Sequence, residues 1–244
     1  MADTALARHK ASEHRISPLQ EHVRQVVYGG NDGIVTTFAV VAGFAGLGAE
    51  GTAEVGVVAV LLFGLANLFA DATAMGLGEF LSSRSEADVY RAVRAKERRE
   101  IEANPEAGIA EAVEILEERG VAGEDAREMA AILARHPEMM TEFMMQYEIG
   151  MSDPSGDRPW VAGTVTFASF VAFGAVPLLP YFAMGGGAAT FAASCGASLM
   201  ALVALGTLRW RASSEPYLRC VGETLLVGGT CAVVAFAVGL AFRA

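Results

Sequence analysis

The stretch GGAATFAASCGASLMALVALGTL, residues 186–208, contains 23 residues and no charged side chain. An α-helix rises about 1.5 Å per residue, so about 20 apolar residues are enough to cross the hydrocarbon core of a bilayer. This length and composition predict a membrane-spanning helix.

Four other stretches have the same character, and together the five predict an all-α polytopic membrane protein with five transmembrane helices. They are residues 28–47, 55–81, 160–182 and 221–242. The connections between the first two spans and among the last three are short, which is typical of antiparallel helix hairpins. The first 25 residues are polar and do not form a secretory signal peptide.

The segment between the second and third spans has a different composition. Residues 83–159 hold 18 of the 28 acidic and 10 of the 18 basic residues. Helical spacing of apolar residues predicts three helices there, at about 84–103, 105–119 and 124–149, the last with a break near His136-Pro137. The first continues the second span. We therefore expect a tail with an interfacial helix (1–27), spans one and two (28–82), a helical insert (83–159) and spans three to five (160–244).

The distribution of Lys and Arg predicts the orientation. With the N-terminus in the cytoplasm, 17 of the 18 basic residues lie on the cytoplasmic side, and only Arg243 lies outside. This is the positive-inside pattern, and it places the insert in the cytoplasm and the C-terminus outside. The net charge of −10 argues against nucleic acid as a partner.

Acidic residues inside predicted spans indicate function, because each costs roughly 3 kcal/mol to insert. Asp32 lies in Gly29-Gly30-Asn31-Asp32-Gly33, where the glycines permit close helix approach or local unwinding. Spans one to three contain no Lys, Arg or His that could neutralise Asp32 or Asp71, so a bound cation or a proton is the natural partner of these two acids. A helix-packing network, or acids buried in neutral form, is the alternative.

A stripe of polar residues also follows one face of the second span. Its members are spaced by four residues: Asn67, Asp71, Met75 and Glu79. The stripe predicts a cation path, in which Asp32 and Glu79 are candidates for protonation linked to transport.

The insert carries acids at helical spacing. Carboxylates from different helices can bind divalent cations through oxygen, and a thioether would favour Fe²⁺ over Mg²⁺ or Ca²⁺. The candidate ligands are Glu97, Glu100, Glu111, Glu114, Met144, Met145 and Glu148. The alternative is that the glutamates are solvated surface residues and the methionines belong to a core.

Two motifs give the sequence a family resemblance. Asn31-Asp32-Gly33-Ile34-Val35-Thr36-Thr37-Phe38-Ala39 resembles the first span of the vacuolar iron transporter family, and Met75-Gly76-Leu77-Gly78-Glu79-Phe80-Leu81-Ser82 resembles its second-span motif. The resemblance extends from about His22 over nearly the whole chain. It implies a homodimer in which paired first and second spans line a Fe²⁺ path, with proton-coupled export from the cytoplasm.

The resemblance also implies roles for single residues. Asp32 and Met75 would be pathway ligands, and the metal-binding residues of the insert would be Glu97, Glu100, Glu111, Met144, Met145 and Glu148. The chain departs from the family pattern twice. Asn67 stands in place of a glutamate, which Asp71 one turn later could replace in charge. Gly108 stands in place of another, for which Glu106 or Glu114 could substitute.

We therefore expect a transporter that moves Fe²⁺ out of the cytoplasm, with Mn²⁺ as a second candidate and Mn²⁺ or Zn²⁺ as alternatives at the insert. The high Ala and Gly content suggests a bacterial plasma membrane. No residue set indicates covalent catalysis, so we do not expect an enzyme. The alternative is a membrane-anchored iron sensor or storage protein without flux. A di-iron oxidase site is disfavoured, because such sites use Glu-x-x-His pairs and the insert has only His136.

Overall fold

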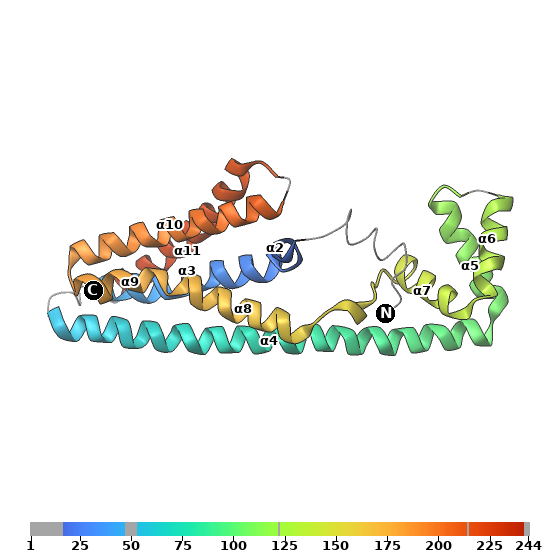
Figure 1. Cartoon of the computed structure of the whole chain (residues 1–244), viewed down its shortest axis with the longest axis horizontal. Coiled ribbons are helices and arrows are strands. Elements are labelled where there is room, and N and C mark those ends of the chain that lie inside the picture. Colours follow the sequence, from blue (N-terminus) through green and yellow to red (C-terminus); the bar gives the residue numbers. More distant parts are fainter. Residues whose placement is uncertain (1–16, 47–52, 122, 214, 242–244) are drawn as a thin grey trace. The chain divides into compact units, whose positions relative to one another are not determined.

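A computed structural model of the chain describes residues 17–46, 53–121, 123–213 and 215–241. All regular secondary structure in these residues is helical, which confirms the predicted all-α class. The chain divides into two compact units: Met1–Phe80 with Trp160–Ala244, called the bundle here, and Leu81–Pro159, called the insert (Figure 1).

Four segments of the described residues are long and apolar enough to cross a membrane. They lie in α4 (Ala53–Ala103), in Pro159–Met184, in α10 (Ala188–Ala212) and in α11 (Tyr217–Ala241). The helix at the first predicted span, α3 (Val23–Gly46), is not among them. Asn31 and Asp32 make the first half of that span polar, and its last predicted residue, Leu47, lies outside the described residues.

α3 begins five residues before the first predicted span. Ser17 and Gln20 form a capping box on the short helix α2 (Pro18–Glu21), and α3 starts at Val23. Arg24 and Gln25 are therefore part of the first turn of α3, although the sequence placed them in the tail. Residues 1–16 of that tail lie outside the described residues.

The helix α8 (Pro159–Gly174) packs backbone to backbone against two other helices of the bundle. A Cβ atom added at Gly33 of α3 would lie 2.4 Å from the Phe170 carbonyl oxygen of α8. One added at Gly163 of α8 would lie 2.5 Å from the Gly76 carbonyl oxygen of α4. Glycine is required at both crossings, because any side chain would force the helices apart.

The glycine-rich run of α3 is therefore used for close helix approach and not for unwinding. The helix is continuous through Gly29–Gly33, and Thr36 Oγ1 donates to the Asp32 carbonyl oxygen at 2.8 Å. These glycines contact α8 within the same chain.

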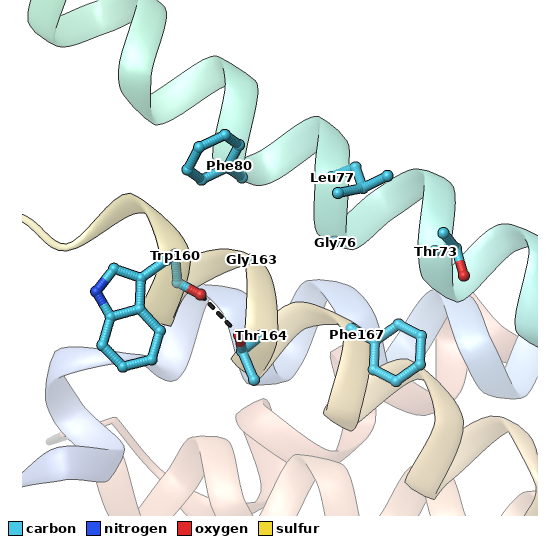
Figure 2. A pocket seen from close by; sticks show the side chains of 8 residues that line it. All are labelled: Thr73, Gly76, Leu77, Phe80, Trp160, Gly163, Thr164 and Phe167. Atoms are coloured by element: carbon cyan, nitrogen blue, oxygen red, sulfur yellow. Dashed lines mark hydrogen bonds between the residues drawn. The ribbon is translucent and has the colours of Figure 1, made fainter.

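A groove of about 390 Å³ lies between α4 and α8 (Figure 2). The hydroxyl of Thr164 donates to the Trp160 carbonyl oxygen at 2.7 Å. The groove is lined by Thr73, Gly76, Leu77, Phe80, Trp160, Gly163, Thr164 and Phe167. These residues supply no carboxylate, thioether or imidazole, so this groove does not have the chemistry of a metal path.

The third predicted span is interrupted. α8 ends at Gly174, and the 3-10 turn η3 (Val176–Leu178) and α9 (Leu179–Met184) follow. Pro177 and Pro180 cannot donate backbone hydrogen bonds, which explains the interruption. Ser194 of α10 donates to the Pro177 carbonyl oxygen at 2.7 Å and so satisfies one group that the interruption leaves free.

The helices α10 and α11 pack against each other and against α3. Ile34, Leu202 and Leu205 are buried at this contact. Many large apolar side chains on the other faces are exposed, such as Leu62, Met200 and Val233. Exposed apolar faces on helices of this length are expected where lipid surrounds the protein.

The insert contains the end of α4 and the helices α5 (Pro105–Glu118), α6 (Glu124–Ala134) and α7 (Pro137–Tyr147). The break expected near His136-Pro137 is present and divides 124–149 into α6 and α7, since Pro137 disfavours helical geometry at the preceding His136, which has φ −126° and ψ 81°. The apolar core of the insert consists of Ala112, Leu116, Ala126, Ala130, Met140 and Met144.

Candidate metal sites

Two carboxylates from different helices form the centre of the candidate path in the bundle. Asp32 on α3 and Asp71 on α4 are both half-buried, and their charges interact. Asn67 Nδ2 donates to Asp71 Oδ2 at 2.7 Å. None of the ion pairs between described residues includes either aspartate. Two like charges near each other favour a shared cation or proton.

The four residues of the stripe predicted on the second span are buried to a similar degree in the structure. All four are half-buried, and they run beside a fully buried row of Leu68, Ala72 and Gly76. Met75 packs against the buried cluster of Leu68, Ala72 and Phe170. The stripe of Asn67, Asp71, Met75 and Glu79 therefore follows the edge of the packed interior.

Glu79 has partners that the sequence did not reveal. Arg24 Nη2 donates to Glu79 Oε1 and Oε2 at 3.0 and 3.2 Å, and Gln25 Nε2 donates to Oε1 at 3.0 Å. The sequence contains one indirect indication that Arg24 belongs to the site. Arg24, Tyr28 and Asp32 are spaced by four residues, so the arginine lies on the same face of α3 as the predicted ligand Asp32.

A cleft of about 1070 Å³ opens beside Asp32 and is lined mainly by α3 and α11. It also contains Arg24, Arg209 and Arg219. Arg24 binds Glu79, and the other two bind Glu223 at 2.6 and 3.1 Å. Each arginine that lines the cleft already has a carboxylate partner. Asp32 therefore lines the cleft without a basic partner among the described residues.

In the insert, three glutamates lie around Glu97: Glu100, Glu111 and Glu148. The Glu97 side chain is buried in an otherwise exposed set. Burial, followed by the charges of Glu148, Glu100 and Glu111, raises the pKa of Glu97. Desolvation, followed by the charges of Glu111 and Glu100, also raises the pKa of Glu148. Such mutual repulsion would be relieved by a bound divalent cation.

A nearby acid shows the opposite behaviour. Glu138 forms ion pairs with Arg94 and Arg98, and the hydrogen bond from Arg94 and the charge of Arg98 lower the pKa of its carboxyl. The raised pKa values of the cluster are therefore found at Glu97 and Glu148, which have no ion pair among the described residues.

The other predicted ligands of the insert are placed differently. Met144 belongs to the apolar core, Met145 is fully buried, and Glu114 is not among the groups whose charges act on Glu97 or Glu148. The described residues contain no set of three His, Cys, Asp or Glu side chains already arranged to hold a metal ion. A Cβ atom at Gly108 would meet Ile101 and Met140 at an ordinary 3.7 Å, so the fold does not require glycine there.

Comparison with known proteins identifies the family. The family model described as the VIT family matches residues 23–240. Vacuolar iron transporter 1 of Oryza sativa subsp. japonica is 33% identical over 224 residues, which cover 91% of this chain and 86% of that protein. The vacuolar iron transporter of Toxoplasma gondii is 34% identical over 239 residues, with 93% and 76% covered. Both relatives are named as transporters and not as enzymes, and this chain belongs to the VIT family.

Proposed function

We propose that this chain exports Fe²⁺ from the cytoplasm in exchange for protons, with Mn²⁺ as a second substrate. The observation that carries the proposal is the pair of half-buried aspartates, Asp32 and Asp71, which interact electrostatically and have no basic partner among the described residues. The names of the relatives support iron as the substrate.

The proposal includes a topology and an assembly. α3 crosses the membrane as a fifth span together with the four more apolar segments, the N-terminus and the insert are cytoplasmic, and the C-terminus is outside. Two copies associate as a homodimer in a plasma membrane. α3 has 24 described residues, enough to cross a bilayer of about 30 Å.

In this proposal the insert captures metal and the bundle passes it on. Glu97, Glu100, Glu111 and Glu148 bind the metal in the cytoplasm, and Asp32, Asp71 and Met75 provide oxygen and sulfur ligands inside the membrane. A proton can replace the cation on the same carboxylates, which is the chemical basis for coupling.

A membrane-anchored metal sensor is the second candidate function. It is favoured by one observation: the acidic cluster lies wholly within the insert, so it could bind metal without any flux. Metal binding alone therefore does not separate the two functions.

The test is metal flux into proteoliposomes for Fe²⁺, Mn²⁺ and Zn²⁺, with and without a pH gradient. We expect Fe²⁺ flux that the gradient drives and that Asp32→Ala abolishes. Asp88→Asn, which removes an exposed acid of the insert, is the control and should leave the flux unchanged. Metal binding without flux in the wild type would exclude transport and favour the sensor.

A further inference from the structure

The carboxylate of Glu79 joins α4 to the first turn of α3 through three hydrogen bonds. Arg24 donates two of them and Gln25 donates the third. Arg24, Gln25 and Glu79 are together called the Glu79 site. It lies on the stripe that also contains Asp71, two helical turns away along α4.

The two charged partners of this site are buried to different degrees. The Glu79 side chain is 11% exposed, whereas the Arg24 side chain is 69% exposed. The guanidinium can therefore move into solvent while the carboxylate stays in place. A buried carboxylate left without a partner is strongly unfavourable, so the departure of Arg24 requires another cation or a proton at Glu79.

Gln25 contributes a second oxygen that has no role in the present arrangement. Its Nε2 group donates to Glu79, and its Oε1 atom is shielded from solvent without a hydrogen-bond partner among the described residues. An unsatisfied buried acceptor costs about 1–3 kcal/mol. Rotation of the amide would turn this oxygen towards the carboxylate of Glu79, where a cation could bind both.

We propose that Glu79 and Gln25 form a divalent-cation site that Arg24 closes when no metal is present. The metal binds the carboxylate oxygens of Glu79 and Oε1 of Gln25, keeps several water molecules, and displaces the guanidinium. Oxygen ligands of this kind suit Fe²⁺ and Mn²⁺. Because Arg24 competes for the same carboxylate, the site binds weakly, as a site that must release its ion requires.

The role of this site in transport rests on the proposed function, but its metal binding can be measured separately. We would use the full chain in detergent and Mn²⁺ as the probe, with binding followed by electron paramagnetic resonance. The background carries Asp32→Asn, Asp71→Asn, Glu97→Gln, Glu100→Gln, Glu111→Gln and Glu148→Gln, which removes the other carboxylates that the proposed function assigns to metal binding.

In this background Arg24→Gln should tighten Mn²⁺ binding about threefold to tenfold, the range expected when a partly exposed competing ion pair is removed. Adding Glu79→Gln or Gln25→Leu should abolish the gain, and Arg24→Lys should bind as the parent does. Arg91→Gln, which removes an exposed arginine paired to Asp88 within the insert, is the matched control. Unchanged Mn²⁺ affinity in Arg24→Gln, or a gain that survives Glu79→Gln, would overturn the proposal.

Flux measurements separate this proposal from the proposed function. In proteoliposomes Arg24→Gln should lower the KM for Fe²⁺, and Gln25→Leu should raise it. If the wild type shows no flux but the Mn²⁺ results are as expected, the cation site stands and the transport function fails. If flux is present and sensitive to Asp32→Asn, but Arg24→Gln changes neither KM nor Mn²⁺ affinity, the Glu79 site alone fails.

Discussion

The bundle and the insert each hold two interacting acids without an ion pair among the described residues, Asp32 with Asp71 and Glu97 with Glu148, but the two pairs are held in different ways. Asp32 and Asp71 lie on helices whose backbones contact α8 at Gly33 and Gly76. Glu97 lies on α4 and Glu148 is the C-cap residue of α7, in a unit whose core is made of side chains, mainly alanine and methionine. The first arrangement leaves almost no freedom for helix movement, whereas the second can adjust by changes of side-chain rotamer.

The acids of the insert and the aspartates of the bundle also differ in their exposure to solvent. Glu100, Glu111 and Glu148 are exposed to water, and only Glu97 is buried. The insert can therefore exchange metal with solution directly. The aspartates of the bundle are both half-buried, so a cation reaching them must lose part of its water. This contrast suits capture by the insert and passage through the bundle.

The largest expected effect comes from the aspartate pair. Asp32→Asn and Asp71→Asn should each lower Fe²⁺ flux by roughly 100-fold, about 2.7 kcal/mol. The double variant should be no worse than either single one, because residues that act on one ion are not additive. Initial rates in proteoliposomes measure this cycle. Additive losses would show that the two carboxylates act independently.

A smaller effect is expected at the backbone contact of α3 and α8. Gly33→Ala places a Cβ atom 2.4 Å from the Phe170 carbonyl oxygen and should destabilise the bundle by about 1–3 kcal/mol. Gly43→Ala on the same helix meets nothing within 4 Å and should be neutral or stabilising. Thermal unfolding in detergent compares the two variants. Equal melting temperatures would show that the close approach does not hold the bundle together.

The pH dependence of the insert should reveal its unpaired glutamates. Since folding raises the pKa of Glu97 and Glu148, the contribution of these two groups to the stability of the metal-free insert is greatest below the ordinary glutamate range and is lost as the pH rises through their folded-state pKa values. Metal affinity changes in the opposite direction, because protons compete with the metal for the carboxylates. It rises with pH, and each unit by which the pH is lowered weakens binding by up to about tenfold for each proton displaced.

Titration calorimetry with Mn²⁺ between weakly acidic and neutral pH measures this dependence on the full chain. The Glu97→Gln, Glu148→Gln variant should have a flatter profile, while Glu138→Gln, at an acid whose carboxyl is bound by arginines, should keep the wild-type slope. A wild-type affinity independent of pH would contradict a role for the raised pKa values.

The smallest expected effect tests the side-chain packing of the insert. The guanidinium of Arg119 lies 4.1 Å from the centre of the Tyr147 ring and so connects the end of α5 to α7. Arg119→Gln should destabilise the insert by about 0.5–1 kcal/mol. Hydrogen exchange at α7 measures the change, with Arg127→Gln on α6 as the control. Unchanged protection would show that this contact contributes nothing.

The sequence predicted the all-α class, four of the spanning segments and the unbroken helix from Ala53 to Ala103, because these depend on long local patterns of hydropathy and charge. It also predicted the family through the motifs around Asp32 and Met75. Whether α3 spans a membrane is not decided by hydropathy, since the residues that suggest function also make the helix more polar.

The details that the sequence missed depend on contacts between distant segments. Arg24 and Glu79 are 55 positions apart, and neither residue identifies the other through local spacing. The close contact of Gly33 with the Phe170 carbonyl oxygen likewise cannot be predicted from the sequence of either helix alone. The core position of Met144 shows the same limit, because its spacing fits a ligand cluster as well as a hydrophobic core.

The most direct test of capture by the insert and passage through the bundle measures Fe²⁺ binding and Fe²⁺ flux on the same preparations of two variants. Asp32→Asn should keep equilibrium metal binding at the insert and lose flux. Glu97→Gln with Glu148→Gln should lose most of that binding and keep flux at saturating Fe²⁺. Flux that persists in Asp32→Asn, or that disappears in the insert variant at saturating metal, would contradict the assignment of passage to the bundle and capture to the insert.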